Sequence, residues 1–71
     1  MEVDVSPDEH GLEQPVSFRA GSHEYTVQNH LDTWYGGIDD IWYKVRASDG
    51  NLYILRHDGA KWTLESFRQA S

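Results

Sequence analysis

The chain has 71 residues, which is enough for one small domain and too few for a two-domain enzyme with a cleft between its domains. Aromatic residues make up 13% of it, a share that disordered chains rarely reach, and the absence of cysteine excludes disulfides, thiolate zinc sites and a cysteine nucleophile. The formal net charge is −6 and unevenly spread: residues 1–14 hold five acids and no lysine or arginine, whereas residues 44–71 hold five bases and three acids.

The composition also bears on location. Small extracellular domains usually carry disulfides, so a chain without cysteine is predicted to be intracellular, and we expect it in the cytoplasm. No stretch approaches the roughly 18 apolar residues of a membrane span. The acidic start has neither the basic nor the apolar region of a secretory signal, and we expect no membrane partner.

Residues 1–14 form the first predicted unit, a flexible acidic tail. They contain no aromatic residue, and their only sizeable apolar residues are Val3, Val5 and Leu12. The alternative is that Val3 and Val5, which alternate with acids, add an edge strand. The tail is predicted to be either a solubilising arm or an acidic segment that folds back on a basic face or docks a basic partner.

Residues 15–68 form the second unit, a single small β domain with strands predicted at 16–20, 25–34, 41–46, 51–56 and 61–67. Gly21-Ser22 fits a two-residue type II′ hairpin loop, which pairs Phe18 with Tyr25 and Val16 with Val27. The alternation slips at Asn29-His30, where we expect a bulge or a bend. The fold class is therefore predicted as all-β, a five-stranded antiparallel meander that closes into a small SH3-like barrel or half-barrel.

The turn at Asp49-Gly50 leaves two registers open. A two-residue type I′ loop pairs Val45 with Ile54, whereas a type I turn followed by a glycine bulge pairs Val45 with Tyr53. A shift of one residue exchanges the faces of the strand. We favour the second register, which leaves Ile54 outside and buries a set of larger residues: Tyr43, Val45, Tyr53, Leu55, Trp62 and Leu64.

In either register Trp42, Lys44 and Arg46 share one face, and the favoured register adds Arg56. A tryptophan beside several cations on a twisted sheet is typical of surfaces that stack bases and follow phosphates, although it is also found on ordinary solvated strands. These four residues are the candidate binding face. The chain offers no catalytic residues, and we expect no enzyme activity and no small-molecule substrate.

Four histidines (His10, His23, His30 and His57) lack the spacing of a zinc site. Asp39 and Asp40 are adjacent, and adjacent carboxylates on a strand point to opposite faces. We therefore expect neither a metal nor another cofactor.

The segment from Pro15 to Phe67 resembles a family of small bacterial all-β domains of unknown function, common in actinobacteria and associated with Y-family-polymerase-like mutagenesis proteins. The matching positions are Pro15, Phe18, Gly21, Tyr25, Val27, Leu31, Trp34, Tyr43, Val45, Gly50, Tyr53, Leu55, Trp62 and Leu64. Most are core or turn positions, so the resemblance implies a fold more than an activity. The family has arginines where this chain has Ser22-His23-Glu24, and a Tyr-Asp where it has Phe67-Arg68.

Two functions follow as expectations. The first is a non-catalytic protein-interaction module that binds a protein partner or a second copy of itself. The alternative is a weak nucleic-acid-binding accessory domain, in a DNA repair or mutagenesis context, that uses the candidate binding face. The two differ in salt response, because phosphate contacts weaken steeply as the salt concentration rises.

Overall fold

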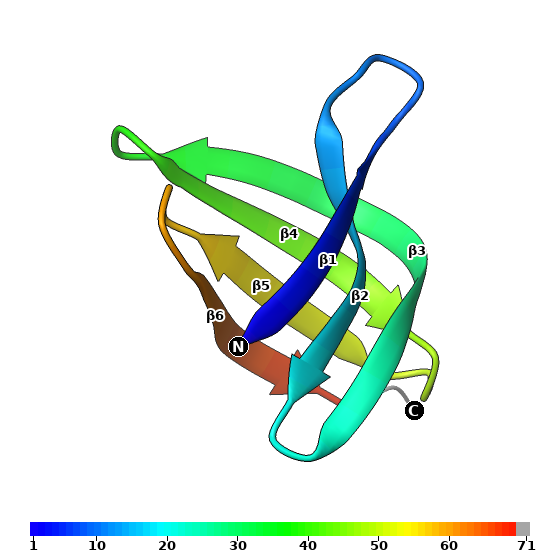
Figure 1. The fold of residues 1–71 in the computed structure, drawn as a ribbon. Coiled ribbons are helices and arrows are strands. Elements are labelled where there is room, and N and C mark those ends of the chain that lie inside the picture. The colour runs from blue at the N-terminus through cyan, green and yellow to red at the C-terminus, as the bar shows by residue number, and fades with distance from the viewer. Residues whose placement is uncertain (70–71) are drawn as a thin grey trace.

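The computed structural model describes residues 1–69, which form six strands and no helix. The strands are β1 (Glu2–Pro7), β2 (Glu13–Ala20), β3 (His23–Gly36), β4 (Asp40–Ala47), β5 (Leu52–His57) and β6 (Trp62–Arg68). All neighbours are antiparallel and the order in the sheet follows the chain, so β1 and β6 are the edge strands. Figure 1 shows the sheet curled into a half-barrel, with β1 and β2 crossing over β4, β5 and β6.

The curl depends on β3, the longest strand. Its first part pairs with β2 and its second part, from Val27 onward, pairs with β4. Two irregularities lie in the second part, one between Val27 and Asn29 and one between His30 and Asp32. Bulges bend a strand and increase its twist, which lets one strand serve both halves of the sheet. The irregularity predicted at Asn29-His30 is displaced by one residue to each side: Asn29 and His30 pair regularly with Arg46 and Val45, and the extra residues are Gln28 and Leu31.

The core lies on the concave, inner face of the sheet. Its buried members come from β2, β4 and β5, and partly buried side chains from the other strands pack around them. The buried set is Phe18, Tyr43, Val45, Ala47, Tyr53 and Leu55; the packed set includes Val3, Tyr25, Val27, Ile41, Trp62 and Leu64. The six residues predicted inside for β4, β5 and β6 all belong to one of these sets.

The register of the β4–β5 hairpin is the favoured one, with Val45 opposite Tyr53 and Lys44 opposite Ile54. Gly50 has φ +83°, a left-handed conformation that glycine adopts without steric cost, and its N–H donates to the Ala47 carbonyl at 2.8 Å. Both features are those of a type I turn closed by a glycine bulge. Tyr43, Val45, Tyr53 and Leu55 therefore face the core, and their neighbours along each strand face outward.

Two expectations need correction. The strands number six rather than five, because residues 2–7, which were assigned to the acidic tail, form β1 along β2. Of the two interpretations of this segment, the edge strand that contains Val3 and Val5 is confirmed, and the flexible tail is wrong for residues 2–7. Val3 reaches the core, and the acids of β1 occupy exposed positions as a solvated edge allows.

The expected pair of Val16 and Val27 is also absent from β2 and β3. Asp4 lies opposite Ser17 and Val5 opposite Pro15, so Val16 is the extra residue of a bulge and is 41% exposed. The bulge changes the alternation of β2, and Pro15 and Phe18, three residues apart, are both buried. The other expected pair of this hairpin, Phe18 with Tyr25, is present, and Ala20 lies opposite His23 next to the turn.

Candidate functional site

The outer face of β4, β5 and β6 carries three cross-strand rows, fixed by the register. One row runs Trp42, Arg56 and Thr63; the second runs Lys44, Ile54 and Ser66; the third runs Arg46, Leu52 and Arg68. The structure therefore brings all four residues of the candidate binding face to one side of the sheet. The four side chains are not equally accessible to a ligand, because each has different neighbours in the structure.

Arg56 is already neutralised. Its Nε lies 2.7 Å from Oε1 of Glu65, and its Nη1 lies 3.6 Å from Oδ1 of Asp40. The Nε–H is not aligned for a hydrogen bond, so the contact to Glu65 is an ion pair. Glu65 is the extra residue of a bulge in β6, between the partners of Ile54 and Leu55. With two carboxylates beside it, Arg56 has little charge left for a ligand.

Trp42 is half-buried rather than a free platform. A Cβ added at Gly36 would come within 2.7 Å of its ring, so one edge of the indole lies against the backbone there. The Trp34 ring lies beside it, nearly parallel at 3° with the centroids 6.2 Å apart. Stacking of a base requires an open ring face, and a half-buried indole with these two neighbours is less accessible than a free one.

Arg46 has one structural contact, a hydrogen bond of 3.1 Å from its Nη1 to the Gly50 carbonyl. It forms no ion pair within residues 1–69, and its other donors remain for a ligand. Lys44 is half-buried between Asp32 on β3 and Ile54 on β5. The Asp32 carboxylate accepts the Thr33 backbone N–H at 2.9 Å, and no carboxylate of residues 1–69 lies within 4 Å of the Lys44 ammonium.

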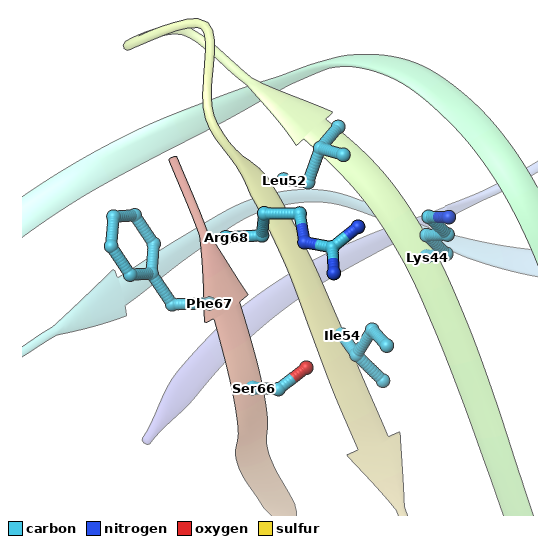
Figure 2. A pocket seen from close by; sticks show the side chains of 6 residues that line it. All are labelled: Lys44, Leu52, Ile54, Ser66, Phe67 and Arg68. Atoms are coloured by element: carbon cyan, nitrogen blue, oxygen red, sulfur yellow. The ribbon is translucent and has the colours of Figure 1, made fainter. Parts of the chain in front are cut away.

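A groove of about 390 Å³ lies on this face. We call it the outer groove, and it is lined by Lys44, Leu52, Ile54, Ser66, Phe67 and Arg68. Figure 2 shows the Arg68 side chain extending over β5 toward Lys44, with Leu52 and Ile54 beside it, while the Phe67 ring lies on the far side of β6. The groove thus has an apolar floor with a cation on either side, and Arg46 lies in the row of Leu52 and Arg68.

Most of the groove was not predicted as a site. Ile54 was expected outside, and Leu52 follows from the same register because it lies two residues earlier on the strand. Arg68 and Ser66 depend on the Glu65 bulge, which shifts the alternation of β6 and leaves no signal in the sequence. Arg68 lies just beyond the strand predicted at 61–67, and in the structure it ends β6.

The turn that positions β4 against β5 is held by a buried tyrosine. The Tyr53 hydroxyl donates to Oδ2 of Asp49 at 2.5 Å, and Asn51 donates its backbone N–H and its side-chain amide to the same carboxylate, each at 3.0 Å. Burial, and then the hydrogen bond to Asp49, raise the pKa of Tyr53. Burial acts to raise the pKa of Asp49, but the hydrogen bonds from Tyr53 and Asn51 outweigh it and lower that pKa.

A second depression lies where the β1–β2 hairpin meets β3. It is lined by Asp8, Gln14, His30, Leu31, Asp32 and Thr33. Partial burial lowers the pKa of His30, while the negative charge of Asp8 acts in the opposite direction. The carboxylates of Asp8 and Asp32 make this an electronegative surface.

The described part of the chain brings together no group of three or more histidine, aspartate or glutamate side chains suited to hold a metal ion. None of residues 1–69 belongs to a helix long and apolar enough to cross a membrane. Comparison with known proteins finds no matching family model, no matching curated protein and no matching solved structure. The resemblance to the small bacterial domains stays a prediction.

Proposed function

We propose that the protein is a non-catalytic protein-interaction module that binds an acidic, partly apolar segment of a partner in the outer groove. One observation carries the proposal: Lys44 and Arg68, which form no ion pair within residues 1–69, flank the apolar side chains of Leu52 and Ile54. Carboxylates of a ligand would meet the two cations, and an apolar side chain between them would cover the floor.

The position of the groove also favours a peptide in extended conformation. The groove borders β6, an edge strand whose outer backbone groups are not paired within the sheet. An extended peptide that adds to such an edge gains main-chain hydrogen bonds and presents alternate side chains to the adjoining face. Side chains that alternate between acidic and apolar would match the basic and apolar residues of the groove.

Nucleic acid is the second candidate, supported by the same free cations together with Arg46. Two features weigh against it. Arg56 is paired with Asp40 and Glu65, and Trp42 is half-buried with its ring beside the Gly36 backbone and Trp34.

Fluorescence anisotropy tests the proposal with three labelled probes: a peptide of alternating Glu and Leu, a peptide of alternating Lys and Leu, and a single-stranded oligonucleotide. We expect the acidic peptide to bind most tightly. Lys44→Glu should weaken that binding at least about tenfold, since it places like charges together. Lys61→Glu, which reverses an exposed base in the β5–β6 turn, is the matched control and should have little effect.

Two results would contradict the proposal. One is equal binding of the acidic and basic peptides, which would show that the cations do not select the ligand. The other is stronger binding of the oligonucleotide with a steep loss at high salt, which would favour the nucleic-acid function.

A further inference from the structure

The loop that joins β1 to β2, with the first residue of β2, carries acidic and apolar side chains that complement the basic and apolar side chains of the outer groove. We call it the acidic tip and define it by Asp8, Glu9, Leu12 and Glu13. Leu12 is 57% exposed, and Glu9 and Glu13 beside it are exposed as well. The chain therefore carries one surface with an apolar residue among carboxylates, and another with apolar residues among cations.

The acidic tip is held in a fixed conformation by its own hydrogen bonds. Oδ1 of Asp8 accepts the backbone N–H of His10 at 2.8 Å and that of Leu12 at 2.9 Å, and the Asp8 N–H donates to the Leu12 carbonyl at 2.8 Å. The two backbone donors lower the pKa of Asp8, which stays charged near neutral pH. A loop ordered before binding loses less conformational entropy when it docks.

The acidic tip does not occupy the groove of its own chain. The β1–β2 hairpin covers the inner face of the sheet, and its tip projects beyond the rest of the molecule (Figure 1). The groove side chains lie on the opposite face of β4, β5 and β6, with the ribbons of β1 and β2 behind that sheet (Figure 2). No hydrogen bond or ion pair within residues 1–69 joins the tip to the groove.

We propose that the acidic tip of one copy docks in the outer groove of a second copy, with Leu12 against Ile54 and the tip carboxylates beside Lys44 and Arg68. This inference rests on the proposed function, because it names the partner of the same groove. The two surfaces lie on different parts of the molecule, so the contact is head to tail. A head-to-tail contact joins copies into rings or open chains rather than into a symmetric dimer.

The contact is small and partly electrostatic, which sets its expected strength. Interfaces of a single loop in a single groove are weak and short-lived. Salt screens exposed charges beyond about 10 Å, so high salt should weaken the contact between the tip and the groove. The repulsion between two copies of net charge −6 is strongest at low salt, so self-association should appear at high protein concentration and intermediate ionic strength.

Sedimentation velocity of the full chain tests the inference with two variants. The groove variant, Lys44→Glu with Arg68→Glu, keeps a normal tip; the tip variant, Glu9→Lys with Leu12→Ser, keeps a normal groove. We expect the wild-type protein to sediment faster as its concentration rises, and each variant alone to remain monomeric. An equimolar mixture of the two variants should form a dimer and nothing larger, because only one functional tip and one functional groove are present.

Matched charge reversals away from both surfaces, Lys61→Glu and Asp39→Lys, should associate like the wild type. Circular dichroism melting of each variant separates loss of contact from loss of fold. A mixture that stays monomeric, while the wild type associates, would overturn the inference, and so would a variant that still dimerises alone. If the wild type stays monomeric but the acidic peptide binds it, this inference fails and the proposed function stands; if the peptide also fails to bind, both fail.

Discussion

The two faces of the β4–β5 hairpin differ in composition, burial and charge, although they alternate residue by residue along the same strands. The inner face carries Tyr43, Val45, Tyr53 and Leu55, all buried and without a formal charge. The outer face carries half-buried side chains that combine lysine and arginine with leucine and isoleucine. The inner face accounts for stability, and the outer face keeps cations and apolar surface available to a ligand.

The largest expected effect comes from truncating one residue on each face of β5. Leu55→Ala removes a side chain with no exposed surface and should lower the free energy of unfolding by about 2–5 kcal/mol. Ile54→Ala, one residue away on the outer face, is the matched control and should cost less than about 1 kcal/mol. Urea denaturation measures both, and equal losses would show that the two faces are not distinct.

A smaller loss is expected from Tyr53→Phe. The change removes the hydroxyl that donates to Asp49 while the ring stays in its place among Phe18, Tyr25 and Phe67. A hydrogen bond to a charged group contributes about 1.5–3 kcal/mol to stability. Because Asp49 is exposed and water can replace part of this interaction, we expect a loss of about 1–2 kcal/mol. Thermal unfolding monitored by near-ultraviolet circular dichroism measures the effect, and an unchanged midpoint would mean that the hydrogen bond is not formed in solution.

Acid should destabilise the fold through the carboxylates of the turns. Hydrogen bonds from backbone N–H groups lower the pKa of Asp8 and Asp58 below the ordinary value of 3.8, and Tyr53 and Asn51 lower that of Asp49. A lowered pKa in the folded state means that the stabilisation is complete above pH 3.8 and is lost as the pH falls through the folded value. The urea concentration at the denaturation midpoint should decrease as the pH is lowered below about 4. Asp49→Asn should make this decrease smaller.

The smallest expected effect on stability belongs to the groove variant, Lys44→Glu with Arg68→Glu. Neither side chain forms an ion pair within residues 1–69, so the free energy of unfolding should change by less than about 0.5 kcal/mol for each. Urea denaturation beside the binding assay measures stability and affinity on one sample. A loss of several kcal/mol would mean that the outer face is part of the structural core.

The fold was predictable where local turn chemistry and alternation agree. At the β4–β5 hairpin, Asp49-Gly50 specifies a bulged turn, and the resulting register buries a consistent set of aromatic and aliphatic residues. The sixth strand was predicted only as the alternative to a flexible tail, because β1 contains a single inward apolar residue, Val3, among exposed positions. The position of β1 depends on its pairing with β2, and the composition of residues 1–14 does not reveal that pairing.

The candidate site was predictable only in part, for a related reason. Trp42, Lys44 and Arg46 fall on one face by strict alternation, and the register adds Arg56. Bulges at Val16 and Glu65 change the alternation of β2 and β6, and neither position has a residue type that marks a bulge. The ion pair of Arg56 with Glu65 and the place of Arg68 follow from the Glu65 bulge, so they emerge only in three dimensions.

The separation of the two faces is tested most directly by a nitrogen–proton NMR titration of the labelled protein with the alternating Glu and Leu peptide. The account predicts that the amide signals of Lys44, Ile54 and Arg68 shift, while those of Val3 and Phe18 on the opposite side stay in place. Shifts confined to β1 and β2, or spread evenly over the core, would contradict it.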